Sequence, residues 1–166
     1  MELKLSNSDL VILIDRDDFP EVSKFNWYTI KAHQYNVSGK RLCNHYVVAQ
    51  INGVRVRLHR LIMRVDNPDI HIDHINGNGL DNRKSNLRKC TNQQNCINRP
   101  KQINNTSGFK GVFLRKSGKY RAGIRFNQKL IHLGTFVDKI DAAKAYNDAA
   151  IKYFGEFAYL NDVENK

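Results

Sequence analysis

The stretch Ile72–Asn95, IDHINGNGLDNRKSNLRKCTNQQN, holds most of the polar groups on which a functional hypothesis for this chain depends. It contains the adjacent pair Asp73 and His74, then Asn86 twelve residues after the histidine, and then Asn95 nine residues further on. An isolated Asp-His pair usually belongs to a surface loop. The full spacing, combined with local signals for a hairpin and a helix, is much more specific and predicts a functional site.

The same stretch is predicted to fold as a β-hairpin followed by a helix. The run Asn76–Gly79 alternates asparagine with glycine, residues that accept positive φ and so favour a tight turn. Residues Asn86–Cys90 are expected to return as the second strand. Thr91 and Gln94 then match a capping box, which predicts that a helix begins there. This fold would bring His74 close to the asparagine side chains of the second strand and the helix.

These residue types suit metal-assisted hydrolysis of a phosphodiester. Asp73 supplies an anionic oxygen and Asn95 a carbonyl oxygen, which are the ligand types that Mg²⁺ prefers. Because Mg²⁺ keeps several of its waters, two protein ligands and substrate oxygens are enough to hold it. The imidazole of His74 has an ordinary pKa of about 6.5, so a neutral ring is available to take a proton from water.

Residues 58–99 contain three motifs, LHRLIM, IDHINGNGLDNRKSNLR and QQNCINR. Together they resemble the HNH endonucleases, which share a ββα-metal core. The resemblance implies that His74 is the general base and that Asp73 and Asn95 hold the cation. It also implies that Asn86 orients the histidine and ties the hairpin together.

Two departures from the family pattern bear on the metal. The third named position is often histidine and is Asn95 here, as in a branch of phage and intron homing endonucleases. Asparagine weakens the binding of soft metals and leaves the preference for hard Mg²⁺ or Mn²⁺ intact. Many relatives carry two CxxC pairs for structural zinc, whereas this chain lacks that spacing, so we predict no zinc. An odd number of cysteines favours a reduced, cytosolic protein: Cys43, Cys90 and Cys96.

The distribution of charge predicts a polyanionic partner. The 166 residues carry a formal net charge of +11, and the span from Asn82 to Val137 contains thirteen Lys or Arg and no Asp or Glu. A long basic surface without neutralising carboxylates suits a nucleic acid; a generally basic surface is the alternative. No run approaches the ~18 apolar residues of a membrane span, and no basic amphipathic helix with bulky apolar residues indicates an anionic membrane.

Residues 1–57 are predicted to form a small β-rich unit, with a short helical turn near Pro20 and a hairpin at Asn52-Gly53. The expected strands are Leu10–Ile14, Trp27–Ile30, Tyr35–Val37, His45–Ile51 and Val54–Leu58. Trp27 and Tyr28 are expected to be core aromatics, and contact with DNA is the alternative, with three exposed basic candidates: Lys31, Lys40 and Arg41. His59 and His71 are expected to be structural or to face phosphate, because the motif already uses another histidine.

Residues 98–107 are polar, lack periodicity and include Pro100, so a linker is predicted there. The predicted domains are therefore a β-rich unit over 1–57, an HNH core over 58–99, a linker over 100–107 and a second module over 108–161.

The second module is predicted to be a three-stranded sheet with one helix. The strands are expected at Lys110–Arg115, Lys119–Phe126 and Lys129–Phe136, joined by turns at Ser117-Gly118 and Asn127-Gln128, and the helix runs from Asp138 to about Phe154. The middle strand alternates, with Tyr120, Ala122, Ile124 and Phe126 on one face and Arg121, Gly123 and Arg125 on the other. A helix would cover the apolar face and leave the basic face for the major groove.

Four motifs between residues 107 and 161, FKGV, KYRAGIRF, IHLGTF and AAKAYNDAA, resemble the APETALA2-type DNA-binding domain of plants. The resemblance implies DNA contacts at four positions: Lys110, Arg115, Arg125 and His132. We add Arg121 because of its face on the strand. Phe113, Gly123 and His132 differ from the residues of the plant domains, so the plant base preference is not transferred.

We therefore expect an α+β protein with a β-rich N-terminal unit, a ββα-metal core and a three-stranded antiparallel sheet packed on one helix. The expected function is that of a phage- or intron-type homing endonuclease, which uses Mg²⁺ or Mn²⁺ to cut double-stranded DNA into 5′-phosphate and 3′-hydroxyl ends. A monomer on DNA is expected, with a dimer left open, in the cytoplasm of a bacterial host. The alternatives are a non-catalytic DNA-binding transcription regulator and an RNA-binding protein. The intact Asp-His-Asn-Asn set argues against the regulator, and the inward-facing aromatics argue against RNA binding.

Overall fold

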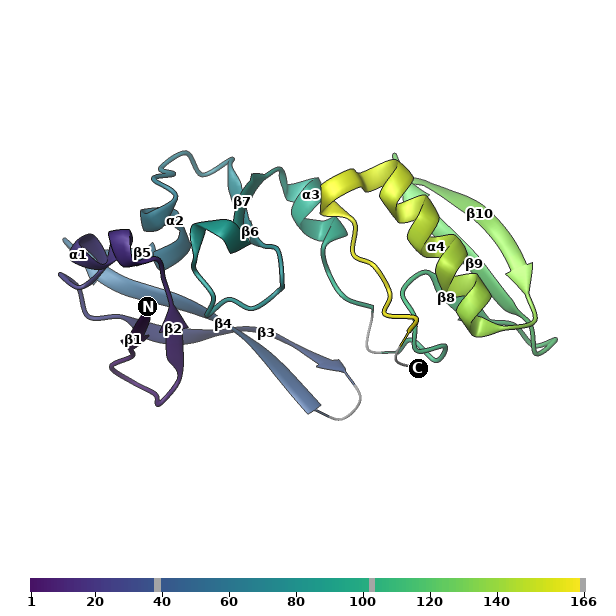
Figure 1. The fold of residues 1–166 in the computed structure, drawn as a ribbon, viewed down its shortest axis with the longest axis horizontal. Coiled ribbons are helices and arrows are strands. Elements are labelled where there is room, and N and C mark those ends of the chain that lie inside the picture. Colours follow the sequence, from purple (N-terminus) through teal and green to yellow (C-terminus); the bar gives the residue numbers. More distant parts are fainter. Residues whose placement is uncertain (38–39, 102–103, 165–166) are drawn as a thin grey trace. The chain divides into compact units, whose positions relative to one another are not determined.

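The computed structural model describes residues 1–37, 40–101 and 104–164, with the backbone alone at 31–37 and 40–44. The chain has a mixed α+β fold and divides into two compact units, Met1–Asn95 and Cys96–Lys166 (Figure 1). This confirms the predicted fold class, whereas the finer predicted boundaries after residues 57, 99 and 107 stay predictions. Within the described ranges, no helix is long and apolar enough to cross a membrane.

The first unit begins with two antiparallel sheets. In the smaller one, β1 (Glu2–Lys4) pairs with β2 (Val11–Leu13). A 3-10 turn at Arg16–Asp18 and the short helix α1 (Phe19–Val22) follow. The larger sheet has the order β3-β4-β5, made of β3 (Tyr28–Val37), β4 (Lys40–Ile51) and β5 (Val54–Arg57).

Most elements predicted for this region are present. Asn52 and Gly53 have φ angles of 50° and 78° and join β4 to β5, as the hairpin signal predicted. The two strands predicted between Trp27 and Val37 are one strand, with an irregular register between Ala32 and Tyr35. Trp27 is buried, and its indole N–H donates to the carbonyl of Val22 at 2.8 Å, which confirms its core role. The predicted basic contacts have side chains outside the described residues: Lys31, Lys40 and Arg41.

The expected hairpin and helix follow the short helix α2 (Leu58–Ile62). Strand β6 (His71–His74) pairs antiparallel with β7 (Leu87–Cys90), and α3 (Asn92–Ile97) comes directly after β7. The capping box forms as predicted: the Thr91 N–H donates to Gln94 Oε1 at 2.8 Å, and the Gln94 N–H donates to Thr91 Oγ1 at 3.2 Å. A ββα arrangement therefore surrounds the Asp-His pair.

One hydrophobic core joins the N-terminal sheets to this hairpin. Its buried members come from β2, β4, α2, β6 and β7 and from the segment before β3, and they include Ile12, Ile14, Trp27, Val47, Leu58, Ile72 and Leu87. Because the hairpin shares its core with strands far away in sequence, those strands determine where the hairpin lies.

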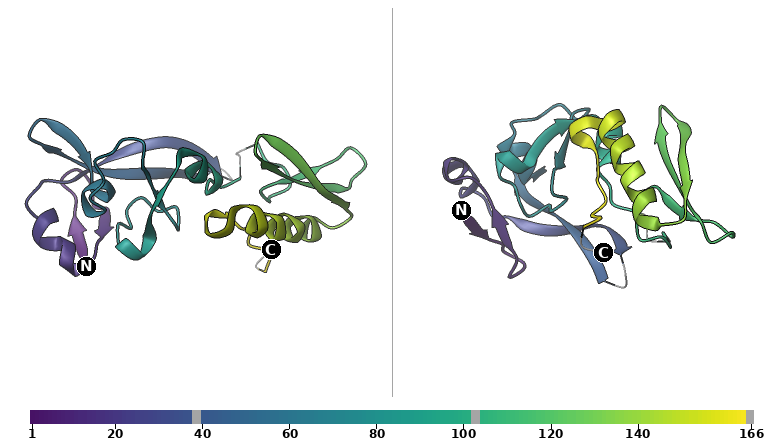
Figure 2. Two further views of the ribbon diagram at one scale, coloured as in Figure 1. Left: turned by 90° about the horizontal axis from the view of Figure 1, so that it is seen from above. Right: turned by 45° about the vertical axis from the view of Figure 1, so that its right-hand side comes forward.

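The second unit is a three-stranded antiparallel sheet in the order β10-β9-β8, with the helix α4 (Lys139–Phe154) on one face (Figure 2). Its strands are β8 (Val112–Leu114), β9 (Tyr120–Phe126) and β10 (Lys129–Phe136). The two turns form at the predicted dipeptides, with positive φ at Gly118, Asn127 and Gln128. Asp138 caps α4 by accepting a bond from the Ile140 N–H.

Small residues let the helix approach the sheet. The buried face of α4 carries Ala142, Ala143, Tyr146, Ala149 and Ala150, which pack on Ala122 and Ile124 of β9. Gly111 has a φ of 73°, and a Cβ there would collide with the Tyr146 ring, so this position requires glycine. The predicted core role of Tyr146 is confirmed.

Candidate active site and nucleic-acid interface

The Asp-His pair ends strand β6 at the entrance to the hairpin loop. Both Asp73 and His74 are buried. The loop closes directly behind them, because the Gly77 N–H donates to the His74 carbonyl at 2.8 Å and the Ile75 N–H donates to the Asn86 carbonyl at 2.9 Å. The backbone of the hairpin therefore holds the pair at a defined position.

The His74 ring lies against a buried amide that the sequence did not single out. His74 Nε2 is 3.3 Å from Oδ1 of Asn82, whose side chain is 1% exposed. The Asn82 Nδ2 donates to the carbonyl of Gly79 at 3.1 Å, which fixes the amide with its oxygen towards the ring. Since an amide oxygen only accepts, Nε2 is the protonated nitrogen, and the neutral ring has its acceptor lone pair at Nδ1.

The loop that carries Asn82 is held by the N-terminal part of the same unit. The Leu13 N–H donates to the Leu80 carbonyl at 2.9 Å, and the Asn82 N–H donates to the Leu13 carbonyl at 2.7 Å. Asp15 Oδ2 accepts a bond from the Lys84 N–H at 2.7 Å. Strand β2 and the residues after it therefore position the loop.

Asn86 ties the hairpin loop together, as the resemblance implied. Its Oδ1 accepts from the Asn76 N–H at 3.0 Å, and its Nδ2 donates to the Asp81 carbonyl at 2.8 Å. Direct orientation of the histidine by Asn86 stays a prediction, whereas Asn82 makes the contact with His74 described above.

Asp73 faces an arginine on the neighbouring strand. Asp73 and Arg88 are directly opposite in the β6–β7 register, and both side chains are largely buried. The guanidinium donates twice to Asp73 Oδ2, from Nε at 3.0 Å and from Nη2 at 2.7 Å. The carboxylate is thus an anionic oxygen group that already holds one positive charge.

A second histidine packs edge-on against the first. The ring of His59, from α2, is 5.2 Å from the His74 ring and 5.7 Å from the Tyr46 ring. Burial, with a smaller contribution from nearby positive groups, lowers the pKa of His59 to about 3. Burial also lowers the pKa of His74, against the opposing effects of the Asn82 hydrogen bond and the charges of Asp73 and Asp81. Both rings are therefore neutral at neutral pH.

Asp73 and Asn95 offer oxygen donors of the type that a hard divalent cation prefers, and their joint role as ligands stays a prediction. Asn95 lies in the first turn of α3 and is partly exposed, with its backbone N–H bonded to the Thr91 carbonyl at 3.0 Å. Among the residues described here, no three His, Cys, Asp or Glu side chains form a metal cluster. A site with two oxygen ligands therefore depends on water and substrate oxygens, which suits Mg²⁺. The absence of zinc stays a prediction.

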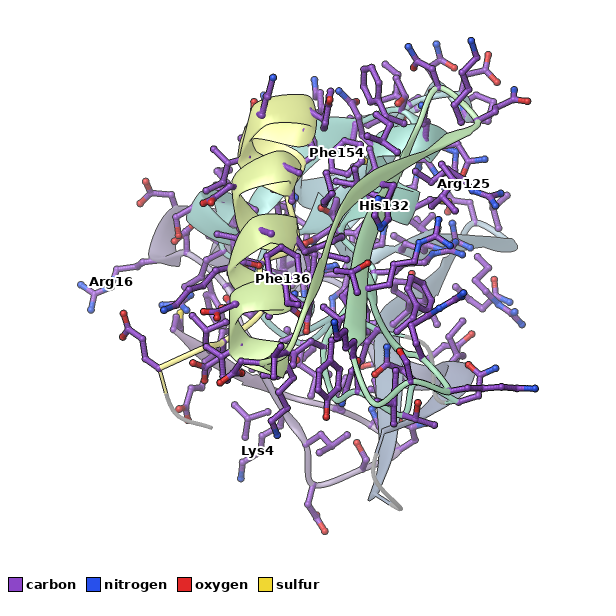
Figure 3. The ribbon with its side chains drawn as sticks, turned by 90° about the vertical axis from the view of Figure 1, so that its right-hand side faces the viewer. Lys4, Arg16, Arg125, His132, Phe136 and Phe154 are labelled. Carbon is purple, nitrogen blue, oxygen red and sulfur yellow. The ribbon has the colours of Figure 1, made fainter. Side chains whose placement is uncertain are left out.

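The basic residues predicted on β9 lie on the sheet face opposite α4. Figure 3 shows Arg125 on the side of the sheet away from α4. Arg121 precedes the buried Ala122, and in the register His132 of β10 is opposite Gly123. Arg115, two residues after the outward-facing Phe113, follows the end of β8 and is exposed. Arg121, Arg125 and His132 therefore share one face of the sheet, which we call the open basic face; Arg125 and His132 are exposed on it and Arg121 is half-buried.

Lys110 differs from the other predicted DNA contacts. Its ammonium group donates to the carbonyls of Ile97 and Arg99, both at 2.6 Å, and lies 5.0 Å from the centre of the Tyr159 ring. Burial lowers its pKa to about 8. Lys110 therefore holds residues 97–99, near the start of the second unit, against the rest of that unit, and its DNA contact stays a prediction.

Comparison with known proteins gives two partial matches along the chain and one long one. A family model described as HNH endonuclease matches residues 56–96. The chain is 35% identical over 156 residues to an uncharacterised HNH endonuclease of Acanthamoeba polyphaga mimivirus. The aligned region covers 91% of this chain and 74% of the viral protein. A further 58 residues are 41% identical to APETALA2-like protein 2 of Oryza sativa, which is 34% of this chain and 13% of the plant protein. No solved structure matches the chain significantly.

Proposed function

Because the chain belongs to the HNH endonuclease family, we propose that it hydrolyses phosphodiester bonds of double-stranded DNA and leaves 5′-phosphate and 3′-hydroxyl ends. The observation that carries this proposal is the buried His74, whose tautomer is set by Asn82 and which directly follows Asp73 on strand β6. A neutral imidazole with a defined acceptor nitrogen is suited to general-base catalysis.

In the proposed reaction, His74 Nδ1 accepts a proton from a water molecule while the water oxygen attacks phosphorus. The bond from phosphorus to the 3′-oxygen breaks, and the departing oxygen takes up a proton from solvent. Asn82 keeps the other ring nitrogen protonated, and Asn86 holds the loop around the base. Asp73 and Asn95 would hold Mg²⁺ or Mn²⁺, which when bound stabilises negative charge on the leaving 3′-oxygen.

The second unit is proposed to bind the duplex through its open basic face. Arg115, Arg121, Arg125 and His132 are the proposed contacts, and the similarity to an APETALA2-like protein supports this role. One active site cuts one strand, so a monomer would nick DNA. We also propose a homing function, a phage or mobile-element origin, and action in the cytoplasm of a bacterial host. The viral source of the relative that aligns over most of the chain supports a mobile origin.

The proposal is tested with supercoiled plasmid and a set of phage genomic DNAs, incubated with Mg²⁺, Mn²⁺ or EDTA and scored for nicked and linear products. We expect cleavage with either metal and none in EDTA. His74→Ala should lose at least about 10²–10⁴-fold in rate, which is the contribution of a general base, and should bind DNA as the wild type does.

His71→Ala is the comparison variant, because it removes a histidine that lies on the same strand but faces away from His74. At saturating enzyme it should lose much less rate than His74→Ala, because it leaves the proposed base in place. Full cleavage by His74→Ala would disprove the assigned base. DNA binding without cleavage under any metal condition would instead favour a DNA-binding transcription regulator.

A further inference from the structure

The open face of the second unit carries two large apolar side chains among its cations. Phe113 of β8 is directly opposite Arg121 of β9, and Leu130 of β10 is directly opposite Arg125. Phe113 and Leu130 are each 52% exposed. Directly opposed residues project on the same face of a sheet, so each apolar side chain stands beside a guanidinium.

A glycine lies at the centre of this face, and the side chain of Leu130 packs over it. Gly123 of β9 has no side chain, and a Cβ placed there would lie 3.5 Å from Cδ1 of Leu130. Leu130 therefore leans inward over the middle strand. The helix packs on the other face against Ala122 and Ile124, so the exposed apolar groups take no part in that core.

The surrounding charge identifies the occupant of this face. A second copy of the same face would place arginines against arginines, which disfavours self-association. Duplex DNA complements the cations, and the span from Asn82 to Val137 has no carboxylate to repel it. The major groove exposes hydrogen-bonding atoms on every base pair, and its apolar feature is the methyl group at C5 of thymine, which phenylalanine contacts favourably.

We propose that Phe113 and Leu130 recognise pyrimidine C5-methyl groups in the major groove, so that the second unit selects sites containing thymine or 5-methylcytosine. This inference rests on the proposed binding of DNA by the sheet face. The neighbouring arginines contact phosphates or guanine, and the two apolar side chains distinguish a methylated pyrimidine from an unmethylated one.

The test uses the full chain and a duplex selected from a randomised library by binding in EDTA. Affinity is measured for that duplex, for a version with deoxyuridine in place of thymidine, and for a version with 5-methylcytosine in place of cytosine. Removal of each contacted methyl should weaken binding about fourfold, which corresponds to burial of one methyl-sized group. The 5-methylcytosine version shows whether the C5-methyl group of 5-methylcytosine is bound as well as that of thymine.

Two variants assign the effect to residues. Phe113→Ala with Leu130→Ala should bind thymine and uracil duplexes with equal affinity. Leu114→Ala is the matched control: this leucine is 50% exposed on β8 but alternates to the other face, so it should discriminate as the wild type does.

The outcomes separate the inference from the proposed function. If the wild-type chain binds thymine and uracil duplexes equally, the methyl inference is wrong, whether or not the variants fold. If discrimination persists in the double variant, other residues read the methyl group and the inference is also wrong. If Arg121→Ala with Arg125→Ala leaves affinity for DNA unchanged, the sheet face is not the DNA-binding surface and the proposed function fails at that point.

Discussion

The chemistry proposed for His74 depends on the orientation of one buried amide. Asn82 presents its oxygen to the ring because its nitrogen is bonded to the Gly79 carbonyl, and a flipped amide would place two oxygens against each other. A neutral imidazole has one donor and one acceptor nitrogen. The amide therefore decides which nitrogen is able to accept a proton.

We expect Asn82→Leu to lower the single-turnover cleavage rate, since loss of the group that fixes a catalytic histidine's tautomer costs up to about 10⁴-fold elsewhere. The bond to Asn82 raises the pKa of His74, so its loss lowers that pKa further. The acid limb of the pH–rate profile should therefore move to lower pH while the plateau falls. A variant that is only less stable would lose rate without moving the limb, and an unmoved limb would contradict the positioning role.

At this scale the sequence predicts the motif residues but not their buried partners. Asp73, His74, Asn86 and Asn95 are recognisable because they follow a spacing within one short stretch. Asn82 lies in the same stretch, but its importance comes from the contact of the loop with strand β2, which no local pattern encodes. The pairing of Arg88 with Asp73 follows from strand register, and the predicted hairpin would have allowed us to infer it.

His59 should make the protein sensitive to acid. Its pKa is about 3 in the folded state and near 6.5 when exposed, so between these values the unfolded chain takes up a proton that the folded chain does not. The free energy of unfolding should then fall by up to about 1.4 kcal/mol per pH unit as pH drops from 6.5 towards 3, with no contribution above 6.5. His59→Phe keeps a flat ring and removes this term. Urea unfolding at pH 5 and pH 7.5 compares the two proteins; an equal loss of stability in both would refute the prediction.

At the scale of elements, the N-terminal strand β2 supports the loop that carries Asn82. Leu13 of strand β2 makes two backbone hydrogen bonds to this loop, one with Leu80 and one with Asn82. Asp15 accepts a bond from the backbone N–H of Lys84, and Asp18 accepts one from its ammonium group. Helix α2 contributes from the other side: Arg60 donates to the carbonyls of Asn67 and Ile70, just before β6.

Asp15→Ala should therefore slow cleavage without touching the proposed chemistry. Loss of the bond to the Lys84 N–H costs about 1–2 kcal/mol and loosens the loop that presents the amide to the histidine. Asp17→Ala is the control, because Asp17 is exposed nearby and carries the same charge. Both variants are compared by thermal unfolding and by single-turnover cleavage. Equal rates for the two would show that this contact does not position the loop.

The elements that were predicted well are those whose signal is local. The alternation along β9 and the capping box at Thr91 both appear as expected, because period and capping chemistry act over a few residues. Strand β1 and helix α2 were not predicted. Both are short, and each is stabilised mainly by contacts with distant residues in the shared core.

At the scale of the whole molecule, the proposed catalytic residues and the proposed DNA-binding face lie in different units. The Asp-His pair and its partners lie within Met1–Asn95, whereas the open basic face lies within Cys96–Lys166. Composition predicted a polyanionic partner for the chain, and the register of the second sheet shows which basic side chains share one face. Binding and cleavage are therefore expected to respond to different substitutions.

Changing both Arg121 and Arg125 to alanine should weaken DNA binding and reduce its dependence on salt. Each lost phosphate contact lowers the slope of log affinity against log salt by about 0.9, and a lost base contact costs about 1–3 kcal/mol. The matched control changes Lys144 and Lys152 to alanine. It removes the same amount of positive charge, but from the exposed side of α4. At saturating enzyme, single-turnover cleavage by the arginine variant should match the wild type, since neither residue belongs to the first unit.

If the lysine variant loses as much affinity and slope as the arginine variant, net charge alone drives binding. If the arginine variant also cuts slowly at saturation, binding and chemistry are not separable along this chain.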